Sequence, residues 1–139
     1  MKQQIGFIGG GQMAEALIRG IIASGLYREN DILVAEPNDF RRDHLEQTYS
    51  VKTYETNQPI FASCRIIILA VKPQTMKALL LDCRERVEAH HIIITIAAGL
   101  PISFYLQTIG KENTKIIRVM PNTPALVLEG ASALSRNDN

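Results

Sequence analysis

The sequence predicts an α/β fold, in which a doubly wound and mostly parallel sheet carries helices on both faces. Short apolar runs rich in β-branched residues recur along the chain, and helical patterns separate them, which is typical of successive strand–helix units. The runs are continuously apolar rather than alternating, as expected for strands covered on both faces. Strands are predicted at Ile5–Ile8, Ile32–Ala35, Ile66–Ala70, Ile92–Ile96 and Ile116–Val119, with a short one near Val51–Thr53.

The helices are predicted from apolar stripes that lie between these runs. Five apolar residues with helical spacing follow the first strand, namely Ala14, Leu17, Ile18, Ile21 and Ile22. Gly25 is expected to end this helix. A second stripe runs from Pro73 to Val87, and its proline fits the first turn of a helix, where a missing N–H costs no hydrogen bond. Pro101 is expected to open a shorter helix in the same way.

Length and composition indicate one soluble domain. The chain has 139 residues, of which we assign 1–134 to the domain and 135–139 to a polar tail that frays. The net charge is +1, and no basic block of the kind that binds nucleic acid is present, so we expect no nucleic-acid partner. The apolar runs are far shorter than the roughly 20 residues that cross a bilayer, so we expect no membrane association. The default prediction is a cytoplasmic protein.

The cysteines and histidines give no sign of a metal site. Cys64 and Cys83 are too few for a disulfide framework or a metal site, and their apolar surroundings predict reduced core residues. His90 and His91 would point to opposite faces of a strand, and no cluster of carboxylates or cysteines accompanies them. We therefore interpret them as a solvated edge before the fifth strand. His44 and its acidic neighbours are interpreted as a helix surface.

The strongest chemical signal is the glycine loop that connects the first strand to the first helix. Gly9, Gly11 and Ala14 match the pattern G-x-G-x-x-A: the first position permits a tight turn, the second lets a pyrophosphate approach, and the third allows close helix–strand packing. The helix N-terminus then offers free N–H groups to phosphates. A glycine run alone fits a flexible turn equally well, but this position favours a Rossmann-type dinucleotide site, which would include Gln12 and Met13. A Walker-type loop is excluded because no Gly-Lys-Ser/Thr follows.

The residues after the second strand bear on the choice between NAD(H) and NADP(H). Glu36 lies a little beyond the usual spacing of about 20 residues for the carboxylate that binds the adenosine ribose. A carboxylate there favours NAD(H), because it would bind a 2′-hydroxyl and repel a 2′-phosphate. Asn38, Arg41 and Arg42 follow closely and are able to hold that phosphate, although both arginines also fit a solvated helix face. The sequence therefore predicts either NAD(H) or NADP(H) as the cofactor.

Three further segments resemble a known enzyme family. The run Met120-Pro121-Asn122-Thr123-Pro124 closely resembles the signature segment of pyrroline-5-carboxylate reductases. Ala70-Val71-Lys72-Pro73 and Ala97-Ala98-Gly99 resemble that family's cofactor-contacting turns after the fourth and fifth strands, and Asn57 matches its asparagine near the adenosine half. The resemblance extends from Ile5 to about Ala133. It implies a cofactor site that includes Asn57, Ala70, Val71, Lys72, Pro73, Ala97, Ala98, Gly99 and Asn122.

These turns also make chemical sense without the family. In an open parallel sheet, ligands bind beyond the carboxyl ends of the strands, where Val71–Lys72 and Ala97–Gly99 both lie. The small residues at 97–99 would leave room for a flat nicotinamide ring, and Lys72 could bind a ribose hydroxyl. An exposed loop lysine is the plainer interpretation of Lys72.

The resemblance implies an activity for the whole enzyme rather than for this chain alone. Pyrroline-5-carboxylate reductases reduce the C=N bond of 1-pyrroline-5-carboxylate to give L-proline, by hydride transfer from NADP(H) or NAD(H). In that family a helical C-terminal domain forms the homo-oligomer and most of the substrate site. That domain is expected to be absent from this chain, which would then bind cofactor without turnover, and its catalytic residues are not identified. A related β-hydroxyacid dehydrogenase and a non-catalytic dinucleotide-sensing module are the alternatives.

Overall fold

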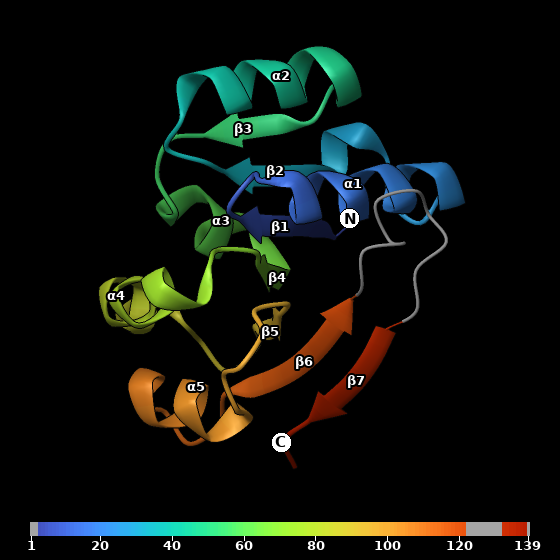
Figure 1. Ribbon diagram of the computed structural model, residues 1–139. Helices are drawn as coiled ribbons and strands as arrows, with labels where there is room; N and C mark the ends of the chain where they lie inside the picture. Colours follow the sequence, from blue (N-terminus) through green and yellow to red (C-terminus); the bar gives the residue numbers. More distant parts are fainter. Residues whose placement is uncertain (1–2, 122–131, 139) are drawn as a thin grey trace.

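The computed structural model describes residues 3–121 and 132–138, and it confirms the α/β architecture predicted from the sequence. Seven strands form one sheet in the order β3-β2-β1-β4-β5-β6-β7 (Figure 1). The first six in this order run parallel to one another, and β7 pairs antiparallel with β6. The strands are β1 (Gln4–Ile8), β2 (Ile32–Ala35), β3 (Lys52–Tyr54), β4 (Cys64–Leu69), β5 (Ile92–Thr95), β6 (Lys115–Pro121) and β7 (Ser132–Arg136).

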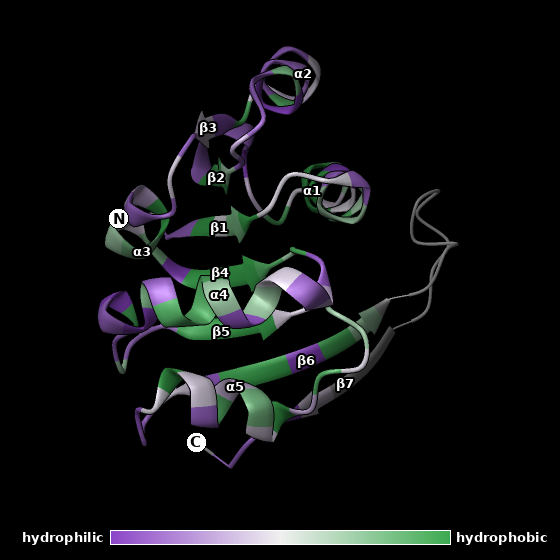
Figure 2. Ribbon diagram, turned by 60° about the vertical axis from the view of Figure 1, so that its left-hand side comes forward, coloured by the Kyte–Doolittle hydropathy of each residue, from purple (hydrophilic) through white to green (hydrophobic). Residues whose placement is uncertain are grey.

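Helices cover both faces of the sheet, as Figure 2 shows. They are α1 (Gln12–Ser24), α2 (Asp39–Tyr49), α3 (Gln58–Ser63), α4 (Pro73–Cys83) and α5 (Ile102–Ile109), with short 3-10 turns at Glu29–Asp31 and Arg84–Arg86. One apolar layer joins α1 and α2 to the sheet and includes Ala14, Ile18 and Leu45. The other joins α3, α4 and α5 to the opposite face and includes Ile60, Met76 and Tyr105. The predicted double winding is therefore present.

The helix boundaries follow the predicted signals closely. Gly25 ends α1 in the left-handed conformation, with φ +74°, and its N–H bonds the last turn of the helix. Pro73 is the first residue of α4, and Pro101 precedes the first residue of α5. The helix α3 was not predicted from the sequence, because its six residues are too few to show a periodic stripe.

The carboxyl-terminal segment differs from the expected fraying tail. Ser135 and Arg136 belong to β7, where they pair with Arg118 and Ile117 of β6. The side chain of Asn137 then accepts a hydrogen bond from Ile116 N at 3.0 Å and donates one to Thr114 O at 2.8 Å. The strand lies at the edge of the sheet and is held there by backbone pairing with β6.

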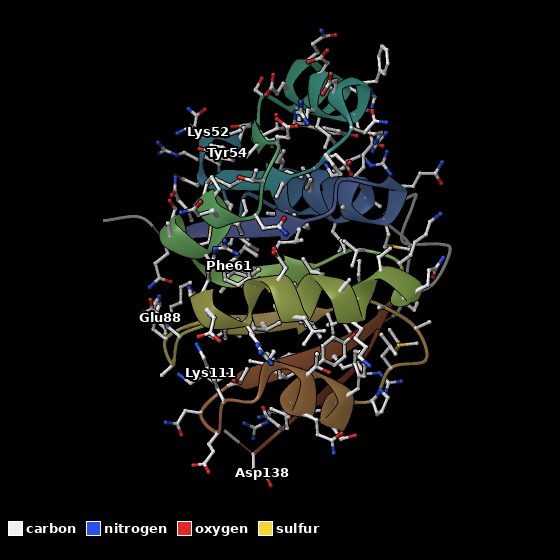
Figure 3. All side chains as sticks on the ribbon, turned by 90° about the vertical axis from the view of Figure 1, so that its left-hand side faces the viewer. Lys52, Tyr54, Phe61, Glu88, Lys111 and Asp138 are labelled. Atoms are coloured by element: carbon white, nitrogen blue, oxygen red, sulfur yellow. The ribbon has the colours of Figure 1, made fainter. Side chains whose placement is uncertain are left out.

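His91 is a second correction, because it is buried rather than solvated, while His90 is exposed. Its Nδ1 accepts a hydrogen bond from Glu88 N at 2.9 Å, and its Nε2 lies 3.0 Å from Phe61 O. A carbonyl oxygen only accepts, so these partners assign a neutral ring protonated at Nε2. Burial lowers the pKa of His91 below its ordinary value and outweighs the opposing bond to Phe61. The ring thereby joins Phe61 of α3 to Glu88 in the segment before β5. Figure 3 shows these two residues on the same side of the molecule.

The two cysteines are buried and unpaired, as predicted. Burial raises the pKa of both thiols to about 11, so neither is a thiolate at neutral pH. Among residues 3–121 and 132–138, no group of His, Cys, Asp and Glu is arranged to hold a metal ion. Within the same ranges, no helix is long and apolar enough to cross a membrane.

Gly6 in β1 is required by packing rather than by backbone conformation, which generates a stability prediction. A Cβ atom at this position would lie 2.4 Å from Cγ2 of Ile60 and 3.0 Å from Sγ of Cys64. We expect Gly6→Ala to lower the free energy of unfolding by about 1–3 kcal/mol, as overpacked cores do. Urea denaturation measures the loss. In the Ile60→Ala background the same substitution should cost less, and equal stability of Gly6→Ala and wild type would contradict the close packing of α3 on β1.

His91 should make stability depend on pH. The unfolded chain protonates this ring near its ordinary pKa of 6.5, whereas the folded state keeps it neutral to lower pH. Stability is therefore lost as pH falls from 6.5 to the folded pKa, by at most about 1.4 kcal/mol per pH unit. Urea denaturation at pH 7.5 and 5.5 should show a larger loss for wild type than for His91→Gln. Identical losses in the two proteins would show that the folded state does not hold His91 neutral.

Candidate functional site

The glycine loop lies where the carboxyl end of β1 meets those of β2 and β4. Gly9 has φ +99°, a conformation that residues with side chains rarely adopt, and its N–H donates to Ala35 O at 2.8 Å. A Cβ atom on Gly9 would lie 2.7 Å from the carbonyl oxygen of Ala70. At Gly10 it would lie 2.9 Å from Cδ1 of Leu45. The fold itself therefore requires glycine at both positions.

Gly11 differs from its two neighbours because nothing in the fold requires it to be glycine. Its φ of −77° is open to any residue, and a Cβ atom there would meet no protein atom within 4 Å. It is the N-cap of α1 and makes no side-chain cap, so the first N–H groups of the helix face an open space. Ala14 is buried against the sheet, while Gln12 is exposed and Met13 half-buried in the first turn. This arrangement fits the close approach of an anionic ligand.

Glu36 and Arg41 bond the two backbone polar groups of Gly10. Oε1 of Glu36 accepts a hydrogen bond from Gly10 N at 2.9 Å, and its Oε2 accepts one from Asn38 N at the same distance. Nε of Arg41 donates to Gly10 O at 2.9 Å. Glu36 was predicted to bind a ribose and Arg41 a phosphate. Both side chains also position the glycine loop.

The interpretation of Arg41 and Arg42 as a solvated helix face is wrong. Arg42 is half-buried and donates to the carbonyl oxygens of Glu36 at 2.7 Å and Pro37 at 3.0 Å, and it pairs with Asp39 at 2.6 Å. Asn38 serves as the N-cap of α2, where its Oδ1 accepts from Arg41 N at 3.1 Å. Arg42 and Asn38 are therefore engaged in local hydrogen bonds that form the turn after β2 and the start of α2.

A polar cluster on α1 and α2 was not predicted from the sequence. Glu15, in the first turn of α1, accepts hydrogen bonds at Oε1 from His44 and, at 3.0 Å, from Tyr49 Oη, and its Oε2 lies 3.4 Å from Nη2 of Arg41. Partial burial pushes the pKa of Glu15 upward, but the hydrogen bonds from His44 and Tyr49 and the nearby charges outweigh it, so the pKa lies below its ordinary value. The carboxylate is ionised at neutral pH.

A groove of about 360 Å³ runs along the carboxyl ends of β1, β2 and β4 and brings many of the predicted residues together. Its walls include the predicted Gly9, Gly11, Glu36, Asn57, Ala70, Val71 and Lys72, together with Ile8, Ala35, Pro37 and Leu79. Asn57 and Lys72 reach it as the N-cap residues of α3 and α4. Pro73 follows as the exposed first residue of α4. The groove is therefore built from the turns that follow the four adjacent strands β3, β2, β1 and β4, together with Leu79 of α4.

The turn after β5 lies beside this groove without lining it. Ile96 N donates to Leu69 O at 3.3 Å, which aligns the turn with the end of β4. Ala97 is buried, whereas Ala98 and Gly99 are exposed. Thr95 supports the turn from below, because its Oγ1 accepts a bond from Ala97 N at 3.4 Å and lies 2.6 Å from Tyr105 Oη. The predicted Asn122 lies outside the described residues.

A larger hollow of about 540 Å³ lies at the amino ends of the strands, between residues 87–89 and 111–114. Its one lysine, Lys111, donates to the carbonyl oxygens of Val87 at 2.6 Å and Glu85 at 3.3 Å, so its charge serves the fold. Ligands of open parallel sheets bind at the carboxyl ends instead. The groove beside Gly11 is therefore the candidate site.

Comparison with known proteins places the chain among dinucleotide-binding oxidoreductases. The family model described as "NADP oxidoreductase coenzyme F420-dependent" matches residues 4–99. A pyrroline-5-carboxylate reductase from Synechocystis sp. is 40% identical over 137 residues, which are 99% of this chain and 50% of that protein. The chain spans about half the length of the curated relatives it matches.

Solved structures give the same result. A pyrroline-5-carboxylate reductase from Coxiella burnetii superposes with a TM-score of 0.92 at 30% identity, covering 99% of this chain and 51% of that one. The pyrroline carboxylate reductase of Plasmodium falciparum, solved with NADP bound, superposes with a TM-score of 0.85 at 30% identity, covering 99% and 49%. The resemblance drawn from the sequence motifs is confirmed by these comparisons.

Proposed function

The chain belongs to the family of coenzyme F420-dependent NADP oxidoreductases, and from this membership we propose that it is the dinucleotide-binding half of a pyrroline-5-carboxylate reductase. The observation that carries the proposal is its similarity to such reductases over 99% of its length, in both sequence and fold. The whole enzyme would reduce 1-pyrroline-5-carboxylate to L-proline. In the whole enzyme, a second half like that of the relatives would supply the substrate site and the contacts of a homo-oligomer. We propose that this enzyme works in the cytoplasm.

We propose NADP(H) or NAD(H), rather than coenzyme F420, as the ligand of the groove. The family description names both NADP and F420, but the relatives that match the whole chain are pyrroline-5-carboxylate reductases, and one of them was solved with NADP bound. The groove fits a dinucleotide, because the space beside Gly11 is open and the N–H groups of α1 face it. When bound, the nicotinamide would supply the hydride that reduces the C=N bond.

The groove and the segments beside it would then have separate tasks. The Gly9–Gly11 loop and the first turn of α1 would bind the pyrophosphate, while Glu36, Arg41 and Asn57 would surround the adenosine half. Val71, Lys72 and the Ala97–Gly99 turn would orient the nicotinamide half. Because Thr95 holds Ala97 N from below, that turn is positioned before the ligand arrives.

The two glycines at the ends of α1 separate ligand binding from stability. In Gly11→Val the new side chain meets open space and no backbone strain, so we expect nearly unchanged stability but at least tenfold weaker NADPH binding, about 1.4 kcal/mol. Gly25→Ala is the matched control: a Cβ atom there also meets nothing, but φ is +74°. That variant should lose stability and keep its affinity. Equal affinity of Gly11→Val and wild type in titration calorimetry would reject the loop as the pyrophosphate site.

The isolated chain should bind cofactor without forming proline. Its groove offers one wall of a reductase site, and the part of the relatives that would enclose a substrate lies beyond this length. NADPH oxidation with 1-pyrroline-5-carboxylate should stay at background for residues 1–139, with the full-length Synechocystis reductase as positive control. Robust turnover by the short chain would show that residues 1–139 contain a complete substrate site.

A further inference from the structure

Arg41 is a cation shared between the glycine loop and an acidic side chain that faces it from α1. Its Nε bonds Gly10 O at 2.9 Å, and its Nη2 lies 3.4 Å from Oε2 of Glu15. The side chains of Arg41 and Glu15 are 31% and 18% exposed, so solvent screens this ion pair only in part. The Nε bond anchors the guanidinium at the loop, while the outer nitrogens have freedom to change partner.

Glu15 is able to release Arg41 without losing its other partners. Its Oε1 accepts from both His44 and Tyr49, and Arg41 faces the other oxygen. The carboxylate therefore stays hydrogen-bonded and ionised when the guanidinium moves away. Arg42 is not an equivalent cation, because its nitrogens already bond the carbonyls of residues 36 and 37 and the Asp39 carboxylate.

The groove wall beside Arg41 carries a fixed negative charge. Glu36 lines the groove, and both of its carboxylate oxygens are held by backbone N–H groups, of Gly10 and of Asn38. A 2′-phosphate on a bound adenosine ribose would meet this carboxylate and would need a cation to offset the repulsion. Arg41 bonds the carbonyl of Gly10, the residue whose N–H bonds Glu36, so its guanidinium is held at the same point of the glycine loop as the Glu36 carboxylate.

We propose that Glu15 sets the preference of this site between NADP(H) and NAD(H), by competing with the 2′-phosphate for the guanidinium of Arg41. The inference rests on the proposed dinucleotide function and adds to it a specificity-determining residue that lies on α1, outside the segment after β2. NADPH binding draws Arg41 away from Glu15, whereas NADH binding leaves the ion pair in place. The ion pair therefore weakens the binding of NADPH and does not affect the binding of NADH.

The test is the ratio of the dissociation constants for NADH and NADPH, measured by titration calorimetry in Glu15→Gln. Glutamine keeps an acceptor for His44 or Tyr49 but removes the charge that holds Arg41. We expect the ratio to rise about three- to fivefold in favour of NADPH, the size of a partly exposed ion pair. Asp43→Asn is the charge-matched control, because Asp43 is exposed on the same helix as Arg41, and its ratio should stay within about twofold of wild type.

A double-mutant cycle separates an effect through Arg41 from a general change in charge. In the Arg41→Met background, Glu15→Gln should leave the ratio unchanged. An equal rise in that background, or no rise in Glu15→Gln itself, would overturn the inference while the dinucleotide function stands. Failure of the wild-type chain to bind either nucleotide would overturn both.

Discussion

The backbone of the glycine loop has no room for side chains at Gly9 and Gly10, and the arrangement of the site depends on this close packing. Parallel pairing brings the carboxyl ends of β2 and β4 to either side of β1, where Gly9 N bonds Ala35 O and Ala70 N bonds Ile8 O. The loop is thereby pressed against the turn that begins at Ala70. At Gly11, the next residue, a Cβ atom would meet no protein atom within 4 Å, so the N-terminus of α1 is open there.

Electrostatics around the loop serve both folding and binding. Glu36 and Arg41 bond the N–H and the carbonyl of a single residue, Gly10, and so hold the peptide groups before and after it. Such charge-assisted bonds are stronger than neutral ones, and they position the loop before a ligand arrives. In the proposed function the same two side chains would lie at the adenosine end of the dinucleotide. Substitutions there are therefore expected to affect loop geometry as well as cofactor choice.

Three buried polar side chains in the apolar layer that contains α3, α4 and α5 have partners on separate elements. Thr95 and Tyr105 connect β5 to α5 directly below the Ala97 turn, and His91 connects α3 to the segment before β5. An unpartnered polar group at these depths would cost about 1–3 kcal/mol. Because hydrogen bonds are directional, these pairs fix the positions of α3 and α5 on the sheet more closely than apolar contacts alone would.

The sequence by itself determined the parallel sheet, the helix α1 and the position of the glycine loop, because these depend on spacing along the chain. Continuous β-branched runs identify buried strands, a helical stripe identifies α1, and glycines between them identify the tight turn. Likewise, Gly25 and Pro73 mark helix ends through their own backbone preferences. The motifs around Ala70 and Met120 pointed to the family for a related reason, since they too are local.

Only the tertiary structure decided which polar side chains meet. The contact of Glu15 with His44 and that of Arg41 with Gly10 join residues 29 and 31 positions apart, and both exist because α2 packs beside α1. His91 became a buried, neutral ring because α3 presents Phe61 O to it, and α3 itself is too short to be recognised by periodicity. Strand β7 forms through backbone pairing with β6 at the sheet edge, and its short mixture of polar and apolar residues shows no strand pattern.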